Sequence, residues 1–192
     1  MNLEQGQQLF ALTTELIAQR NWDLAQTNLE ALERAFPERE SIKINLLTVL
    51  LEKKLPEKCE RLVNNLQHST SSVALQNCGK YFELLNRFDI ALEYYTRALG
   101  LDKNNLEIIN CCSVTCAKLG YYEKAAHLSE SCFSISKDSY FLKRASYYYA
   151  SCCNWNEEQR CWNHATDAPH PFFDISRLTD ATACRMSAEN YT

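Results

Sequence analysis

Glycine and proline are scarce in this sequence, which contains four of each in 192 residues. Tight turns between β-strands depend on these residues, so the chain has little material for hairpins. Long segments with apolar residues at helical spacing dominate instead. The sequence therefore predicts an all-α fold without strands.

Long apolar runs are also missing. No apolar run reaches the roughly 18 residues that a membrane-spanning helix needs. The first residues, MNLEQGQQLFALTTEL, contain no basic leader followed by a continuous apolar block. The ten cysteines lie within the helical pattern, and without a signal peptide they favour free thiols in a reducing compartment. We expect a soluble, cytoplasmic protein without a membrane partner.

The sequence has no excess of positive charge. It contains 20 Lys and Arg residues against 24 Asp and Glu, a net charge of −4, and the basic residues are scattered. A nucleic-acid groove would need them gathered in a stripe. A glycine-rich phosphate loop is absent, and no Cys or Ser stands in a recognisable catalytic arrangement. We therefore expect no nucleic-acid partner, no cofactor and no enzymatic activity.

The clearest positive pattern lies between residues 73 and 101, VALQNCGKYFELLNRFDIALEYYTRALGL. Large, small and aromatic residues follow one another there at fixed distances: Leu75, Cys78, Gly79, Phe82, Ala91, Tyr95 and Ala98. This order resembles the helix pair of the tetratricopeptide repeat (TPR) family, whose unit has about 34 residues. Gly79 and Ala91 are expected to let the two helices approach closely, and Phe82 and Tyr95 to fill the space between adjacent pairs.

The pattern recurs along the chain at a nearly constant period. The residues at the position of Ala91 are separated by 34, 32, 34 and 34 residues, and they are Ala25, Cys59, Ala91, Ala125 and Gln159. Each repeat is expected to contain a first helix, a tight turn and a second helix, with Gly120 in the turn of the fourth. The five predicted repeats span about 6–39, 40–71, 72–105, 106–139 and 140–173.

Together these repeats predict an α-solenoid, a right-handed superhelix of five TPR helix pairs over residues 1–173. The period stops after Pro171. Residues 174–192 are expected to form a linker and a helix that begins near Thr179.

The last part of the chain carries a second, shorter resemblance, over about forty residues. Its pieces are Asn154-Trp155, Pro171-Phe172, Leu178, Asp180 and a helix that ends in Ala188 and Tyr191. They are similar to the junction in bacterial O-linked N-acetylglucosamine transferase-like proteins (glycosyltransferase family 41), where TPRs give way to the catalytic region. In that family the sugar-nucleotide site and the catalytic residues lie beyond this junction. The resemblance therefore transfers no catalytic residue to this chain.

Two groups of Cys and His residues have the chemistry of metal ligands. The first comprises Cys111, Cys112, Cys116, His127 and Cys132, and the second Cys152, Cys153, Cys161, His164 and His170. Three of the first group, Cys112, Cys116 and Cys132, fall at repeat positions that hold packing residues one repeat earlier, and buried Cys behaves as a small hydrophobe. The second group has no regular ligand spacing. We predict core packing for those three thiols and no metal site in either group.

The concave face of TPR proteins is lined by residues of the first helices. The resemblance implies that the equivalent positions of this chain line such a groove. Amides recur among them. Asn45 and Asn77 fall where the transferase family has an asparagine ladder, which Ala11, Cys111 and Ala145 interrupt here. An Asn side chain has both a donor and an acceptor, so a row of them can hold an extended peptide by its backbone.

The predicted peptide contacts in this groove are Asn45, Asn77, Lys80, Asn110, Arg144 and Tyr148. Other residues at groove positions of the first helices include Gln7, Phe10, Ile44, Thr48 and Gln76. The alternative that these polar side chains are merely solvated stays open.

The sequence as a whole indicates a non-catalytic scaffold that binds a protein or peptide in the concave groove. One alternative is the substrate-recruiting front of a transferase of the family named above, without its catalytic domain. Another is a self-associating module, such as a homodimer, because Tyr147, Tyr148, Tyr149, Phe172 and Phe173 would leave an apolar patch.

Overall fold

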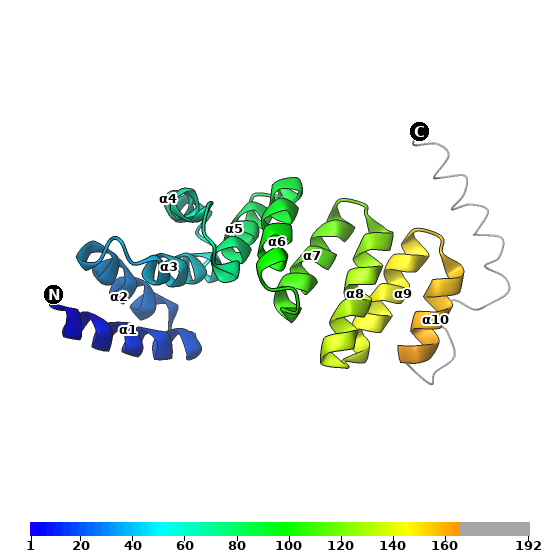
Figure 1. Cartoon of the computed structure of the whole chain (residues 1–192), viewed down its shortest axis with the longest axis horizontal. Coiled ribbons are helices and arrows are strands. Elements are labelled where there is room, and N and C mark those ends of the chain that lie inside the picture. Colours follow the sequence, from blue (N-terminus) through cyan, green and yellow to red (C-terminus); the bar gives the residue numbers. More distant parts are fainter. Residues whose placement is uncertain (166–192) are drawn as a thin grey trace. The chain divides into compact units, whose positions relative to one another are not determined.

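A computed structural model describes residues 1–165 of the chain (Figure 1). Within these residues it contains ten α-helices and no strand, which confirms the predicted all-α helical-repeat fold. The helices are α1 (Leu3–Ala18), α2 (Trp22–Ala35), α3 (Glu40–Glu52), α4 (Pro56–Leu66), α5 (Ser72–Leu84), α6 (Phe88–Leu101), α7 (Leu106–Lys118), α8 (Tyr122–Ser136), α9 (Ser139–Ser151) and α10 (Trp155–Ala165).

The helices fall into two compact units, divided between Lys103 and Asn104. Unit 1 holds α1 to α6, and unit 2 holds α7 to α10. Within each unit, helices that follow one another in the sequence pack together, and in unit 1 α3 also packs on α5. The odd-numbered helices are the first helices of the pairs and the even-numbered ones the second helices.

All five pairs make their internal turn in the same way. One residue in each turn has a positive φ: Arg20 (58°), Lys54 (55°), Asn86 (57°), Gly120 (80°) and Cys153 (58°). The backbone N–H of the next residue donates to a carbonyl in the last turn of the first helix, as from Asn21 to Leu16 at 2.9 Å and from Tyr121 to Cys116 at 2.9 Å. This is the Schellman motif, which ends a helix on a left-handed residue. Gly120 occupies the turn that the sequence predicts for it.

Four of the five second helices bury a small residue at their fourth position. Ala25, Cys59, Ala91 and Ala125 are all fully buried there. In α10 the fourth position is Glu158, which is 3% exposed, while Gln159 is exposed. The assignment of Gln159 to this position was therefore wrong by one residue, because α10 begins at Trp155 and the last step of the repeat is one residue shorter than the step before it.

The pair α5 and α6 shows why a glycine stands at position 79. A Cβ atom on Gly79 would lie 2.5 Å from the ring of Tyr95, which is fully buried. The predicted close approach at Gly79 is thus confirmed. The ring of Tyr95 thus packs within its own pair, and its place between adjacent pairs stays a prediction. Its hydroxyl donates to Glu83 at 2.6 Å.

Some sequence predictions fall beyond the described residues. These are the end of the repeat at 140–173, the linker and helix at 174–192, and the part of the transferase resemblance that runs from Pro171 to Tyr191. Among the helices of residues 1–165, none combines the length and the apolar character needed to cross a bilayer.

The shared turn geometry predicts opposite effects for two glycines. A methyl group on either Gly120 or Gly100 would meet nothing within 4 Å, but only Gly120 has a positive φ. We expect Gly120→Ala to lower the free energy of unfolding by about 1 kcal/mol and Gly100→Ala, inside α6, to raise it by about 0.5 kcal/mol. Urea unfolding of the full chain measures both. Equal effects of the two substitutions would contradict the role of backbone conformation at Gly120.

Candidate binding faces of the two units

Asn77 in unit 1 joins two first helices. Its side chain is 3% exposed, and Nδ2 donates to Thr48 Oγ1 at 2.7 Å and to the Ile44 carbonyl at 3.5 Å. The Thr48 hydroxyl in turn donates to the same carbonyl at 3.0 Å. The amide that the sequence places on the binding face therefore connects α5 to α3.

Two other predicted contacts of unit 1 are more accessible than Asn77. Asn45 lies on α3 and Lys80 on α5, and both are partly exposed. Asn45 follows Ile44, whose carbonyl accepts the hydrogen bond from Asn77. The buried amide thus fixes the backbone beside a more exposed amide on the same face.

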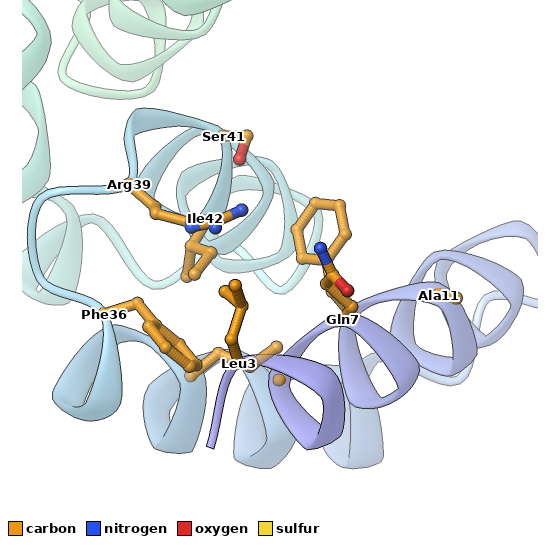
Figure 2. A pocket seen from close by; sticks show the side chains of 10 residues that line it. Leu3, Gln7, Ala11, Phe36, Arg39, Ser41 and Ile42 are labelled. Carbon is orange, nitrogen blue, oxygen red and sulfur yellow. The ribbon is translucent and has the colours of Figure 1, made fainter. Parts of the chain in front are cut away.

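Unit 1 also contains a pocket of about 140 Å³ between α1, the end of α2 and the start of α3 (Figure 2). Its apolar walls include Leu3, Phe36 and Ile42, while Gln7 and Arg39 add polar groups. Gln7 and a second lining residue, Phe10, are groove positions that the sequence identifies.

The sequence prediction missed the residues that shape this pocket. Gly6 leaves room for the Phe36 ring, because a Cβ on Gly6 would overlap the ring carbons. Phe36 is the C-cap of α2, and Arg39 is the N-cap of α3. Both lie in the connection between two pairs, outside the first-helix positions that the repeat pattern identifies. A glycine inside an amphipathic helix was the one available signal of a close approach.

In unit 2 three of the predicted contacts lie together, since Asn110 and Tyr148 both lie near the guanidinium of Arg144. Arg144 on α9 donates from Nη1 to Asn110 Oδ1 at 2.6 Å and from Nε to Ser129 Oγ at 3.1 Å. The guanidinium lies 6.0 Å from the ring centroid of Tyr148, which is buried, and it also lies near the rings of Tyr140 and Phe141. Arg144 therefore holds α7, α8 and α9 together while it is surrounded by aromatic rings.

Burial shifts the pKa values of two groups close to Arg144. Burial raises the pKa of the Tyr148 hydroxyl, and the nearby Arg144 charge opposes that shift. Burial likewise raises the pKa of the Cys132 thiol, against the same charge. Both groups are thus neutral near pH 7, and the Asn110 and Ser129 acceptors of Arg144 are neutral oxygens. One guanidinium nitrogen, Nη2, is buried without a hydrogen-bond acceptor among the described residues.

Three cysteines of unit 2 lie in the core, as the sequence predicts. Cys112, Cys116 and Cys132 are buried, which confirms core packing, and burial raises the pKa of Cys112 to about 12. In the second group Cys152 and Cys153 are exposed, and Cys161 is buried with its thiol directed to Glu130 at 3.4 Å. His164 packs against Phe133, and His170 lies beyond the described residues. In residues 1–165 no three His, Cys, Asp or Glu side chains are grouped as metal ligands would be.

Comparison with known proteins shows the fold. No protein-family model and no curated protein matches the chain. Among solved structures, a crystal structure of MamA has a TM-score of 0.72 at 15% identity, covering 84% of this chain and 90% of MamA. A thermophilic TPR protein of Thermus thermophilus has a TM-score of 0.66 at 14% identity, covering 94% of this chain and 99% of that protein. MamA of Desulfovibrio magneticus RS-1 has a TM-score of 0.71 at 7% identity, covering 83% and 92%.

These likenesses show that the chain has the fold of TPR structures. The sequence resemblance to TPR helix pairs is therefore supported. The resemblance to the transferase junction stays a prediction.

The contact of Asn77 with Thr48 predicts a measurable coupling. We expect Asn77→Ala and Thr48→Ala each to lower the free energy of unfolding by about 1 kcal/mol, because each removes the 2.7 Å hydrogen bond between the two side chains. The double variant should lose about 1 kcal/mol less than the sum. Asn45→Ala is the control and should change stability by less than about 0.5 kcal/mol. Strict additivity in urea unfolding would show that the hydrogen bond contributes nothing.

Proposed function

We propose that the chain is a non-catalytic scaffold that binds a peptide or helix of another protein through the faces of its first helices. The observation that carries this proposal is the pocket in unit 1, where α1 presents the groove residues Gln7 and Phe10, and α3 presents Ile42, beside an open space of about 140 Å³. The TPR fold supports protein interaction in general, because repeated helix pairs expose an extended row of side chains.

Each unit offers its own contacts for such a ligand. In unit 1, Asn45 and Lys80 bind the peptide, and Asn77 positions α3 and α5 through its contact with Thr48. An amide at Asn45 can both donate to a peptide carbonyl and accept from a peptide N–H.

In unit 2, Asn110, Arg144 and Tyr148 form the corresponding group. The guanidinium of Arg144 is ordered by Asn110 and by aromatic rings, so a bound group would meet a side chain that has already lost its rotamer freedom. A preorganised cation with aromatic neighbours suits a peptide carbonyl or carboxylate.

Self-association remains the second candidate, and one observation favours it. Tyr148 and Tyr149 are buried, but Tyr147 on α9 is 65% exposed and Trp155 on α10 is 43% exposed. Exposed aromatic residues of this kind are common where a second chain binds. The transferase alternative depends largely on residues beyond Ala165.

Site-specific photocrosslinking tests the proposed face. A benzoylphenylalanine at position 45 should crosslink one partner, and the same group at position 58, exposed on α4, should not. With that partner purified, Asn45→Ala combined with Lys80→Ala should weaken binding about tenfold, equivalent to about 1.4 kcal/mol. Lys58→Ala is the matched control. Equal crosslinking from both positions, or unchanged affinity in a titration, would contradict the proposal.

A further inference from the structure

The pocket of unit 1 has walls that suit one apolar side chain. Leu3 and Phe10 come from α1, Phe36 from the end of α2 and Ile42 from α3. Figure 2 shows the Leu3 side chain beside Ile42 and the Phe36 ring, with Gln7 further along α1. Three separate elements thus contribute carbon atoms to one concave surface.

The size of this pocket sets the size of its occupant. Its volume is about 140 Å³. An engineered apolar cavity of about 150 Å³ binds benzene, so a space of this size accepts one aromatic ring or a leucine-sized group. A whole helix does not fit, but a single anchoring side chain does. Such anchors provide much of the binding energy in protein interfaces.

A positive charge lies beside the pocket, and it favours an acidic group next to the bound apolar side chain. Arg39 lines the pocket, and its guanidinium lies 5.8 Å from the centroid of the Phe36 ring. The Phe36 ring is therefore both a wall of the pocket and a support for this cation. Among the ion pairs within residues 1–165, none includes Arg39. A carboxylate next to a bound apolar group would complement this charge.

We propose that this pocket binds one large apolar side chain of a protein partner. Arg39 then pairs with an acidic residue that stands next to that apolar residue in the partner's sequence. The inference rests on the proposed function, since it names the chemistry of a segment bound at the first-helix face. Gly6 is the residue that makes the site, because its lack of a Cβ lets the Phe36 ring form the wall next to Arg39.

Two small molecules test this chemistry on the full chain. 3-Phenylpropionate carries a ring and a carboxylate, and 3-phenylpropanamide is its neutral counterpart. In ¹H–¹⁵N correlation spectra both should shift the amide signals of Gly6, Ser41 and Ile42 in a saturable way. The carboxylate should bind about two- to fivefold more tightly, as expected for an exposed ion pair.

Arg39→Gln should remove the difference between the two molecules while the amide still binds. Arg34→Gln, an exposed substitution on α2, should leave the difference intact. Equal binding of both molecules to the unaltered chain, or shifts away from the pocket, would overturn the inference.

Peptides distinguish an acidic side chain from a terminal carboxylate. A peptide Ser-Gly-Phe-Asp-Gly-Ser with both ends blocked should bind better than the same peptide with Asn in place of Asp. Preference for a free C-terminal acid instead would overturn the assignment to an acidic side chain. Concentration-dependent dimerisation that Arg39→Gln abolishes would show that a second copy is the occupant, against the proposed partner.

Failure of this inference is separable from failure of the proposed function. Crosslinking from position 45 depends on α3 and does not require the apolar pocket. If position 45 crosslinks the partner but neither phenyl compound binds, the proposed function stands and the assignment of the pocket as an anchor site is wrong.

Discussion

The structure depends on the close approach of the two helices within each pair. In four pairs this approach is made at a fully buried small residue of the second helix, as at Ala25 and Ala91. A left-handed residue then turns the chain so that the second helix can return along the first. With the pairs fixed in this way, side chains of neighbouring first helices within one unit come into contact. The links from Asn77 to Thr48 and from Arg144 to Asn110 are products of that arrangement.

The fold was predictable because packing constraints recur with a period. Gly79, Ala91 and Tyr95 are chosen by contacts within a pair, so their spacing is visible in the sequence. The turns were less visible, since only Gly120 among the five left-handed residues is a glycine and the others include Arg20 and Lys54. The positions of those turns follow from the repeat period. Their backbone hydrogen bonds do not require one residue type, so the residues in the turns do not indicate them. The same dependence on the period misplaced Gln159 by one residue, where the repeat shortens.

The candidate site was predictable only as a set of positions. The repeat pattern places Asn45 and Asn77 on one face, but it does not show which of the two amides hydrogen-bonds within the protein itself. Asn77 is buried, and its amide donates to the Thr48 hydroxyl, one pair earlier, at 2.7 Å. The pocket was missed because Phe36 and Arg39 belong to the connection between pairs, where the repeat imposes no fixed residue type. Contacts between elements that are distant in sequence need coordinates to be seen.

The central claim is that the first helices bear the binding face. Hydrogen exchange of the full chain, measured with and without a purified partner, tests it most directly because each helix is observed separately. We expect added protection in α1, α3 and α5, with little change in α2 and α4. Protection confined to the second helices, or no change in any helix at saturating partner, would contradict it.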